Sequence, residues 1–270
     1  MPPRLARLNV REIHQDALLA SVANNATGQA AKQPVREPVK EPATANAPRY
    51  CCTWRIESSV KKLGYAAIAG CDEAGRGALL GPLYAAAVIL DPARRIRGLD
   101  DSKKLTPAER EEFALAIRVK ALAFAVVAIS AADVDLLNVY QASRRAMIQA
   151  LAQLQPVPDY VLTDAMRLAG WGDAVEFSIP YRAIIHGDAR SVSIAAASIL
   201  AKTARDAHLA ELDRRYPQYR LAQNKGYGTP EHLDGLAQFG PCPEHRRTFA
   251  PVKGFDLPLF PGPVDPIPMA

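Results

Sequence analysis

Short apolar runs alternate with amphipathic stretches from about residue 65 onward, which predicts alternating strands and helices. The apolar runs are bounded by glycine, proline or polar residues, as buried strands commonly are. We expect five strands, at residues 65–71, 83–90, 121–129, 159–163 and 176–185.

Capping boxes predict where two of the helices begin. Thr106 has proline directly after it and glutamate three positions on, and Ser130 is followed by Asp133 at the same spacing. We expect helices at residues 106–119, 130–153, 192–216 and 229–239. Elements in this order favour an α/β fold in which helices cover a mixed sheet.

The composition divides the chain into three parts. Residues 1–53 and 253–270 are rich in proline and polar residues and offer little to bury, so we expect a flexible leader and an extended tail. The folded domain is expected over residues 54–252, with a helical segment at its C-terminal end.

Charge and cysteine usage narrow the class of protein. The net charge is +5 and the pI is about 9.0, which favours a polyanionic partner. Four cysteines match neither a zinc pattern nor a disulfide framework, which suggests a cytoplasmic protein. We see no signal peptide and no apolar run long enough for a membrane span, and we expect a monomer.

The stretch from Gly70 to Gly77 carries the strongest chemical signal. Asp72 and Glu73 end an apolar run, and Arg76 follows between two glycines. Adjacent carboxylates suit a hard divalent cation, while glycine and arginine suit a phosphate. In a regular strand the two carboxylates would point to opposite faces, so both reach one metal only if the strand ends there and the chain bends.

Two further aspartates lie where they can complete such a site. Asp164 follows the fourth predicted strand, and Asp188 precedes the long helix. Each also has a simpler interpretation, Asp164 as the start of a turn and Asp188 as a helix N-cap. A dinucleotide loop is disfavoured, because the glycines that follow Asp72 and Glu73 do not fit G-x-G-x-x-G.

Several short motifs follow one another along the chain. They are Asp72-Glu73-Ala74-Gly75-Arg76-Gly77, Gly81-Pro82, Asp101-Ser102-Lys103-Lys104-Leu105, Gly187-Asp188, Ile194 to Lys202, Arg205-Asp206, Lys225-Gly226-Tyr227-Gly228-Thr229 and His245-Arg246-Arg247-Thr248-Phe249-Ala250-Pro251. With these motifs in this order, the chain resembles bacterial ribonuclease HII over roughly residues 65–252.

The resemblance implies a ribonuclease H-like fold with a mixed five-stranded sheet. It also implies endonucleolytic cutting of RNA paired to DNA and of single ribonucleotides embedded in DNA, leaving 3′-hydroxyl and 5′-phosphate ends, with Mn²⁺ or Mg²⁺. Asp72, Glu73, Asp164 and Asp188 then resemble the catalytic metal ligands. The residues that resemble substrate contacts are Gly75, Arg76, Gly77, Lys103 and Tyr227.

The chain departs from the family pattern at two places. Ala78 stands where proline usually follows, and Ala165 stands where glycine often follows the third carboxylate. Asp164 is therefore the least securely aligned ligand, with Asp159 and Asp173 as competitors. Ribonuclease HIII and a non-catalytic hybrid-binding protein remain as alternatives.

The tail holds a second pattern. Asp256-Leu257-Pro258-Leu259-Phe260 resembles the short peptide by which bacterial replication proteins bind the sliding clamp. Two leucines and a phenylalanine outside the core suit a hydrophobic groove on a partner. The alternative is that Leu257, Leu259 and Phe260 pack on their own domain.

Overall fold

A mixed sheet forms the centre of the computed structural model, which describes residues 52–169 and 177–255. All but the last two residues of the predicted leader, and all but the first three of the predicted tail, lie outside these ranges. The described residues belong to one compact unit, Pro48–Ala270. None of the described helices is long and apolar enough to cross a membrane.

The predicted number of strands and the mixed character of the sheet are confirmed. The order across the sheet is β3-β2-β1-β4-β5, with β1 antiparallel to β2 and parallel to β4. β3 is antiparallel to β2, and β5 is parallel to β4. The strands are β1 (Ile68–Ala74), β2 (Leu83–Ile89), β3 (Ala123–Ile129), β4 (Tyr160–Asp164) and β5 (Tyr181–Ile184).

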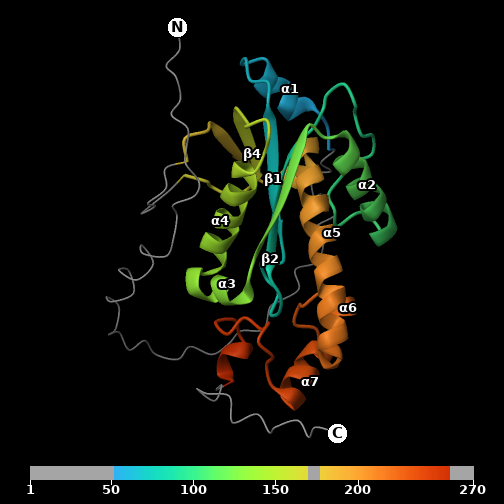
Figure 1. Ribbon diagram of the computed structural model, residues 1–270, viewed down its shortest axis with the longest axis vertical. Coiled ribbons are helices and arrows are strands. Elements are labelled where there is room, and N and C mark those ends of the chain that lie inside the picture. Colours follow the sequence, from blue (N-terminus) through green and yellow to red (C-terminus); the bar gives the residue numbers. More distant parts are fainter. Residues whose placement is uncertain (1–51, 170–176, 256–270) are drawn as a thin grey trace, which may run out of the picture. The chain divides into compact units, whose positions relative to one another are not determined.

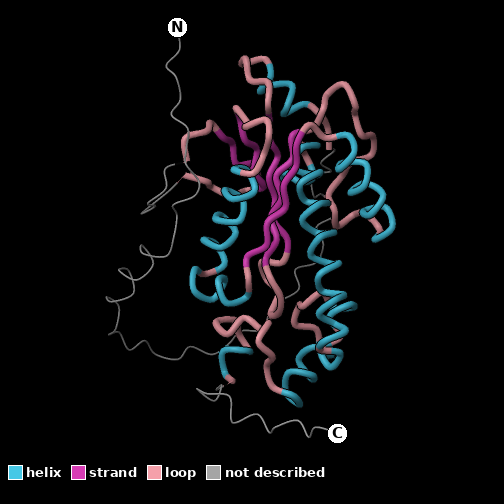
Figure 2. Tube along the Cα trace, in the orientation of Figure 1, coloured by secondary structure: helices cyan, strands magenta, loops and turns pink. Residues whose placement is uncertain are grey.

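Helices cover both faces of the sheet, which is seen nearly edge-on between them (Figure 1, Figure 2). The helices α3 (Ala131–Leu137) and α4 (Val139–Ala152) pack on one face, and α2 (Pro107–Lys120) and α5 (Val192–Arg215) on the other. Gly70 lets α5 approach β1 closely, because a Cβ there would lie 2.0 Å from the Ser193 carbonyl carbon.

The C-terminal helical segment lies beyond one end of the sheet, where α6 (Leu221–Asn224) and α7 (Pro230–Phe239) follow α5 (Figure 1). Leu80, from the loop after β1, packs there with Leu209 and Tyr219. The C-terminal segment therefore holds the loop between β1 and β2. This brings the motif that contains Gly75–Gly77 next to the motif that contains Tyr227.

Three strand boundaries differ from the sequence-based expectation by three residues or more. β1 starts three residues late because the N–H groups of Ala66 and Ala67 donate to the Asp159 carboxylate. It then runs through Asp72 and Glu73 rather than ending at residue 71. The described part of the last strand is shorter than expected, since Pro180 has no N–H for a sheet ladder.

The helix expected over residues 130–153 is two helices. Asn138 separates them with a left-handed φ of 65°, and its side chain accepts from the N–H groups of Tyr140 and Gln141 to begin α4. The short helix α1 (Arg55–Lys61) was not expected. Its buried Glu57 accepts from Ser191 Oγ at 2.6 Å and Ser193 N at 3.0 Å, which anchors α1 on the start of α5.

Candidate active site

Asp72 lies on the face of β1 that packs against α5. It is 5% exposed, it accepts a hydrogen bond from the Ser198 hydroxyl, and its Oδ1 accepts from the backbone N–H of Glu73 at 2.7 Å. Ser198 sits two turns into α5, so the helix that covers the sheet also orients this carboxylate.

Asp164 ends β4, the strand parallel to β1, and so lies beside Asp72 at the same edge. Its Oδ1 accepts from the backbone N–H of Gly187 at 2.7 Å. This bond joins the end of β4 to a short 3₁₀ helix, Gly187–Ala189, that carries the buried Asp188. The N-cap interpretation of Asp188 is wrong, because Ser191 caps α5.

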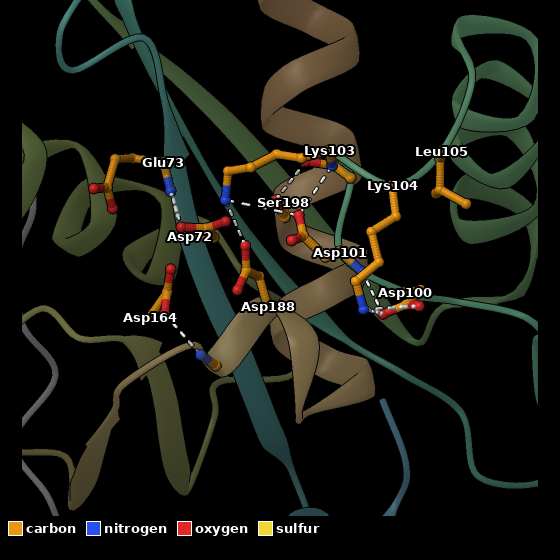
Figure 3. Close-up of polar contacts among 12 residues, drawn as sticks. Asp72, Glu73, Asp100, Asp101, Lys103, Lys104, Leu105, Asp164, Asp188 and Ser198 are labelled. Atoms are coloured by element: carbon orange, nitrogen blue, oxygen red, sulfur yellow. Dashed lines mark hydrogen bonds and ion pairs between the residues drawn. The ribbon is translucent and has the colours of Figure 1, made fainter. Parts of the chain in front are cut away.

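Three carboxylates from three separate segments converge at this edge (Figure 3). The ligand atoms of Asp72, Asp164 and Asp188 all lie within 4.8 Å of one another, a spacing at which they could hold a metal ion. Parallel strands end side by side, so the topology of β1 and β4 produces this convergence.

Glu73 is turned away from the other three carboxylates (Figure 3). β1 stays regular here, with Asp72 opposite Ala86 and Glu73 opposite Ala85, so the two side chains leave on opposite faces. The bend considered from the sequence does not occur. Glu73 Oε1 accepts from Arg76 Nη1 at 3.1 Å, and its Oε2 is buried without a hydrogen-bond partner.

Burial makes negative charge costly at this site. It raises the pKa of Asp72 well above the usual value, with further contributions from Glu73 and Asp164. Burial also raises the pKa of Asp164, assisted by Asp188, and brings that of Glu73 to about 7. A cation would relieve this repulsion, and the buried Oε2 of Glu73 is a further free oxygen. The residues present therefore fit a divalent metal.

Lys103 supplies positive charge at the mouth of the cluster. Its Nζ lies 2.8 Å from Asp188 Oδ2, while the side chain is 75% exposed. The pKa of Lys103 is raised overall. Partial burial alone would lower it, but the hydrogen bond and charge of Asp188, together with the charges of Asp101 and Asp72, outweigh burial.

Two serines at the site carry roles that the sequence did not reveal. The hydroxyl groups of Ser102 and Ser198 lie 3.0 Å apart, which ties the Lys103 loop to α5 beside Asp72. The available signal was Ser198 itself, a polar residue in the middle of a buried run of alanine and isoleucine.

The Gly75-Arg76-Gly77 loop and Tyr227 meet at one side of the cluster. Tyr227 is 42% exposed, and a Cβ on Gly77 would lie 3.9 Å from its Cε1, so the ring faces the loop. The buried Arg246 holds the loop by donating to the carbonyl oxygen of Arg76 at 2.8 Å. The structure thus brings together two of the three segments that resemble substrate contacts, the Gly75–Gly77 loop and Tyr227.

Of the competitors to Asp164, only Asp159 lies within the described residues. Its carboxylate binds the backbone before β1, at the opposite end of β4 from the cluster. Asp173 lies outside the described ranges.

A mixed five-stranded sheet in this order, with carboxylates gathered at the ends of two parallel strands, is typical of the ribonuclease H-like class of nucleases. Residues 69–252 match the family model for Ribonuclease HII. The chain belongs to the ribonuclease HII family. It is 50% identical over 193 residues to Ribonuclease HII of Bordetella pertussis, covering 72% of this chain and 93% of that protein. It is 48% identical over 205 residues to that of Solibacter usitatus, with coverages of 76% and 87%.

Solved structures agree with this fold. Ribonuclease H2 from Pyrococcus horikoshii superimposes with a TM-score of 0.59 at 25% identity, covering 70% of this chain and 96% of that chain. The ribonuclease HII in a PCNA complex from Archaeoglobus fulgidus gives 0.56 at 25% identity, with coverages of 67% and 93%. The predictions of fold, family and endoribonuclease activity are therefore confirmed, and both the ribonuclease HIII and the non-catalytic alternatives are set aside. The family depends on divalent metal, which fits the buried acidic cluster.

Proposed function

We propose that this ribonuclease H cuts the RNA strand of RNA–DNA hybrids and also cuts duplex DNA at single embedded ribonucleotides, leaving 3′-hydroxyl and 5′-phosphate ends. The observation that carries the proposal is the position of the Asp72, Asp164 and Asp188 cluster. It lies at one edge of the sheet, beside a glycine-rich loop and an exposed tyrosine.

Asp72, Glu73, Asp164 and Asp188 are the residues proposed to hold Mn²⁺ or Mg²⁺. Asp72, Asp164 and Asp188 would share one ion, while Glu73, which leaves β1 on the opposite face, would serve a second ion. Ions bound there would supply an activated water and neutralise charge on the leaving oxygen of the phosphodiester. Glu73 has the free buried oxygen that such a role needs, although Arg76 pairs with its other oxygen. The fixed carboxylates position the reacting groups, and Ser198 holds Asp72 in place.

The loop of Gly75, Arg76 and Gly77 is proposed to recognise the 2′-hydroxyl of the ribonucleotide, the group that separates RNA from DNA. Tyr227 is proposed to pack on the sugar beside it, since its ring is accessible and faces the same loop. Lys103 is proposed to meet a phosphate, because its side chain is exposed and its ammonium group carries a stabilised charge.

A sliding clamp is proposed as a partner. The structural relative from Archaeoglobus fulgidus is described in complex with PCNA, and the tail of this chain contains Leu257, Leu259 and Phe260 in a clamp-binding pattern. These three residues lie outside the described ranges. We place the protein in the cytoplasm and expect it to act as a monomer.

The deciding experiment uses a labelled DNA duplex that carries one ribonucleotide. We expect a single cut with Mn²⁺ or Mg²⁺ and no cut with EDTA. A polymerase should extend the product from its 3′-hydroxyl, and a ligase should reseal the nick through its 5′-phosphate. If protein shown to be folded cleaves neither this duplex nor a long RNA–DNA hybrid with either metal, the proposal is overturned. Cleavage of a long hybrid alone would overturn only the part concerning embedded ribonucleotides.

A further inference from the structure

Arg205 lies buried on α5 between the two segments proposed to contact substrate. Its guanidinium donates from Nε to the Pro82 carbonyl at 3.2 Å and from Nη2 to the Leu80 carbonyl at 3.3 Å. On its other edge, Nη1 donates to the Lys225 carbonyl at 2.9 Å. One side chain therefore bonds the loop after β1 and the loop before Tyr227 at the same time.

The guanidinium also touches both of the proposed recognition groups. A Cβ on Gly75 would lie 2.0 Å from Arg205 Nε, so only glycine leaves room for the arginine, and φ at this position is +90°. On the other side, the guanidinium carbon lies 5.7 Å from the centre of the Tyr227 ring, a distance at which a cation is attracted to an aromatic face.

The two loops also contact each other directly where Arg205 binds them. Leu79 N donates to the Gly226 carbonyl at 2.8 Å, and a Cβ on Gly226 would lie 2.5 Å from the Leu80 carbonyl oxygen. This contact leaves the two loops little freedom to move relative to each other. The planar guanidinium of Arg205 donates to carbonyl groups of both loops at once, which a lysine ammonium group cannot do with the same fixed geometry.

We propose that Arg205 is a positioning residue that fixes the Gly75–Gly77 loop relative to Tyr227 and thereby sets the selectivity for a ribonucleotide within a duplex. The inference rests on the proposed function of those two segments. Arg205 sits about two turns beyond Ser198 on the same helix, so α5 orients both the carboxylate Asp72 and the substrate loops. The catalytic cluster and the recognition loops thus share one rigid support.

The test compares Arg205→Lys with Arg214→Lys, the same chemical change at an exposed position of the same helix. For each protein we measure kcat and KM on a duplex with one ribonucleotide, and the inhibition constant of an all-DNA duplex of the same sequence. For Arg205→Lys we expect KM to rise about tenfold with kcat lowered less than about threefold, while the all-DNA inhibition constant stays unchanged. Arg214→Lys should match the unsubstituted protein.

Gly75→Ala provides a second, independent route, because it displaces the guanidinium without removing it. Its effect should not add to that of Arg205→Lys in the double variant, as expected for two changes to one contact. If Arg205→Lys does not fold, Arg205→Gln and Gly75→Ala are compared in the same way.

The possible outcomes separate the two proposals. If the unsubstituted protein does not cleave the duplex, the proposed function fails. If it cleaves and Arg205→Lys retains its KM, the positioning role is wrong. A parallel rise in KM and in the all-DNA inhibition constant would also overturn the inference, since it would indicate a general loss of duplex binding.

Discussion

His232 and His245 face each other in the C-terminal segment with their Nε2 atoms 3.1 Å apart. The backbone N–H of Cys242 lies 3.0 Å from His245 Nδ1 and can only donate to it, so the proton of His245 is on Nε2. His232 then accepts at Nε2 and donates from Nδ1 to the Tyr227 carbonyl at 2.9 Å. Both rings are neutral, and the chain of bonds ends at the residue proposed to pack on the sugar.

Because His232 and His245 are buried and neutral, we predict that the free energy of unfolding falls as the pH is lowered. Burial, with His232 once that ring is protonated and with the charge of Arg247, lowers the pKa of His245 to about 3, and burial lowers that of His232. As the pH falls below the unfolded value of about 6.5, the unfolded chain takes up protons that the folded chain refuses. Each such histidine therefore costs about 1.4 kcal/mol of unfolding free energy per pH unit, down to its folded pKa.

His245→Asn tests this prediction, because asparagine can still accept from Cys242 N–H but does not titrate. The variant will be less stable at pH 7, since it loses the ring contact with Tyr219. Between pH 6.5 and 5 the stability gap to the unsubstituted protein should narrow by about 2 kcal/mol in urea melts. EDTA in both samples keeps the carboxylates equivalent. Parallel stability curves would contradict the prediction, because they would show that folding does not lower the pKa of His245.

The assignment of Asp164 can be tested against its competitor Asp159. Asp164→Asn retains the oxygen that accepts from Gly187 N–H but removes the charge, so we expect cleavage to fall at least about 100-fold. Asp159→Asn should cleave within a few-fold of the unsubstituted protein, because its carboxylate binds only the backbone before β1. Stabilisation by added Mn²⁺, seen as a shift in Tm, should shrink in the first variant alone. If Asp159→Asn lost cleavage and Mn²⁺ stabilisation while Asp164→Asn kept both, Asp159 would be the metal ligand instead of Asp164.

Local patterns predicted the elements that local interactions build. The capping box at Thr106 is present as expected, and the five apolar runs form the sheet. Asn138 was missed because its left-handed φ is a conformation that asparagine adopts only in some contexts. Helix α1 was missed because its anchor, the bond between Glu57 and Ser191, joins residues 134 positions apart.

The same distinction applies to the site. Motifs identified Asp72 and Asp188, and topology explains how they meet. The bond between Ser102 and Ser198 spans 96 positions and has no local pattern. The direction of Glu73 could not be predicted either, since it depended on whether β1 continued past Cys71, and cross-strand pairing with β2 decides that.

Ala165 is a stabilisation target beside the site. Its φ is +53°, a left-handed conformation that costs a residue with a Cβ about 1–2 kcal/mol, and this accounts for the glycine often found there in the family. After the greater flexibility of unfolded glycine is included, we expect Ala165→Gly to stabilise the protein by about 0.5–1 kcal/mol. Ala210→Gly, at an exposed position in the interior of α5, is the matched control and should destabilise by about 1 kcal/mol. Equal losses in both variants would contradict the prediction.

The tail offers a test of the proposed clamp contact. We expect the double variant Leu259→Ala, Phe260→Ala to bind purified bacterial sliding clamp at least about tenfold more weakly than the unsubstituted chain, because it removes two large apolar anchors. The matched control, Val264→Ala with Ile267→Ala, removes apolar groups outside the pattern and should bind normally. Cleavage of a short duplex without clamp should be the same for all three proteins. Equal clamp binding by the double variant and the unsubstituted chain would exclude this peptide as the contact, whereas equal loss in both variants would indicate a nonspecific apolar effect of the tail.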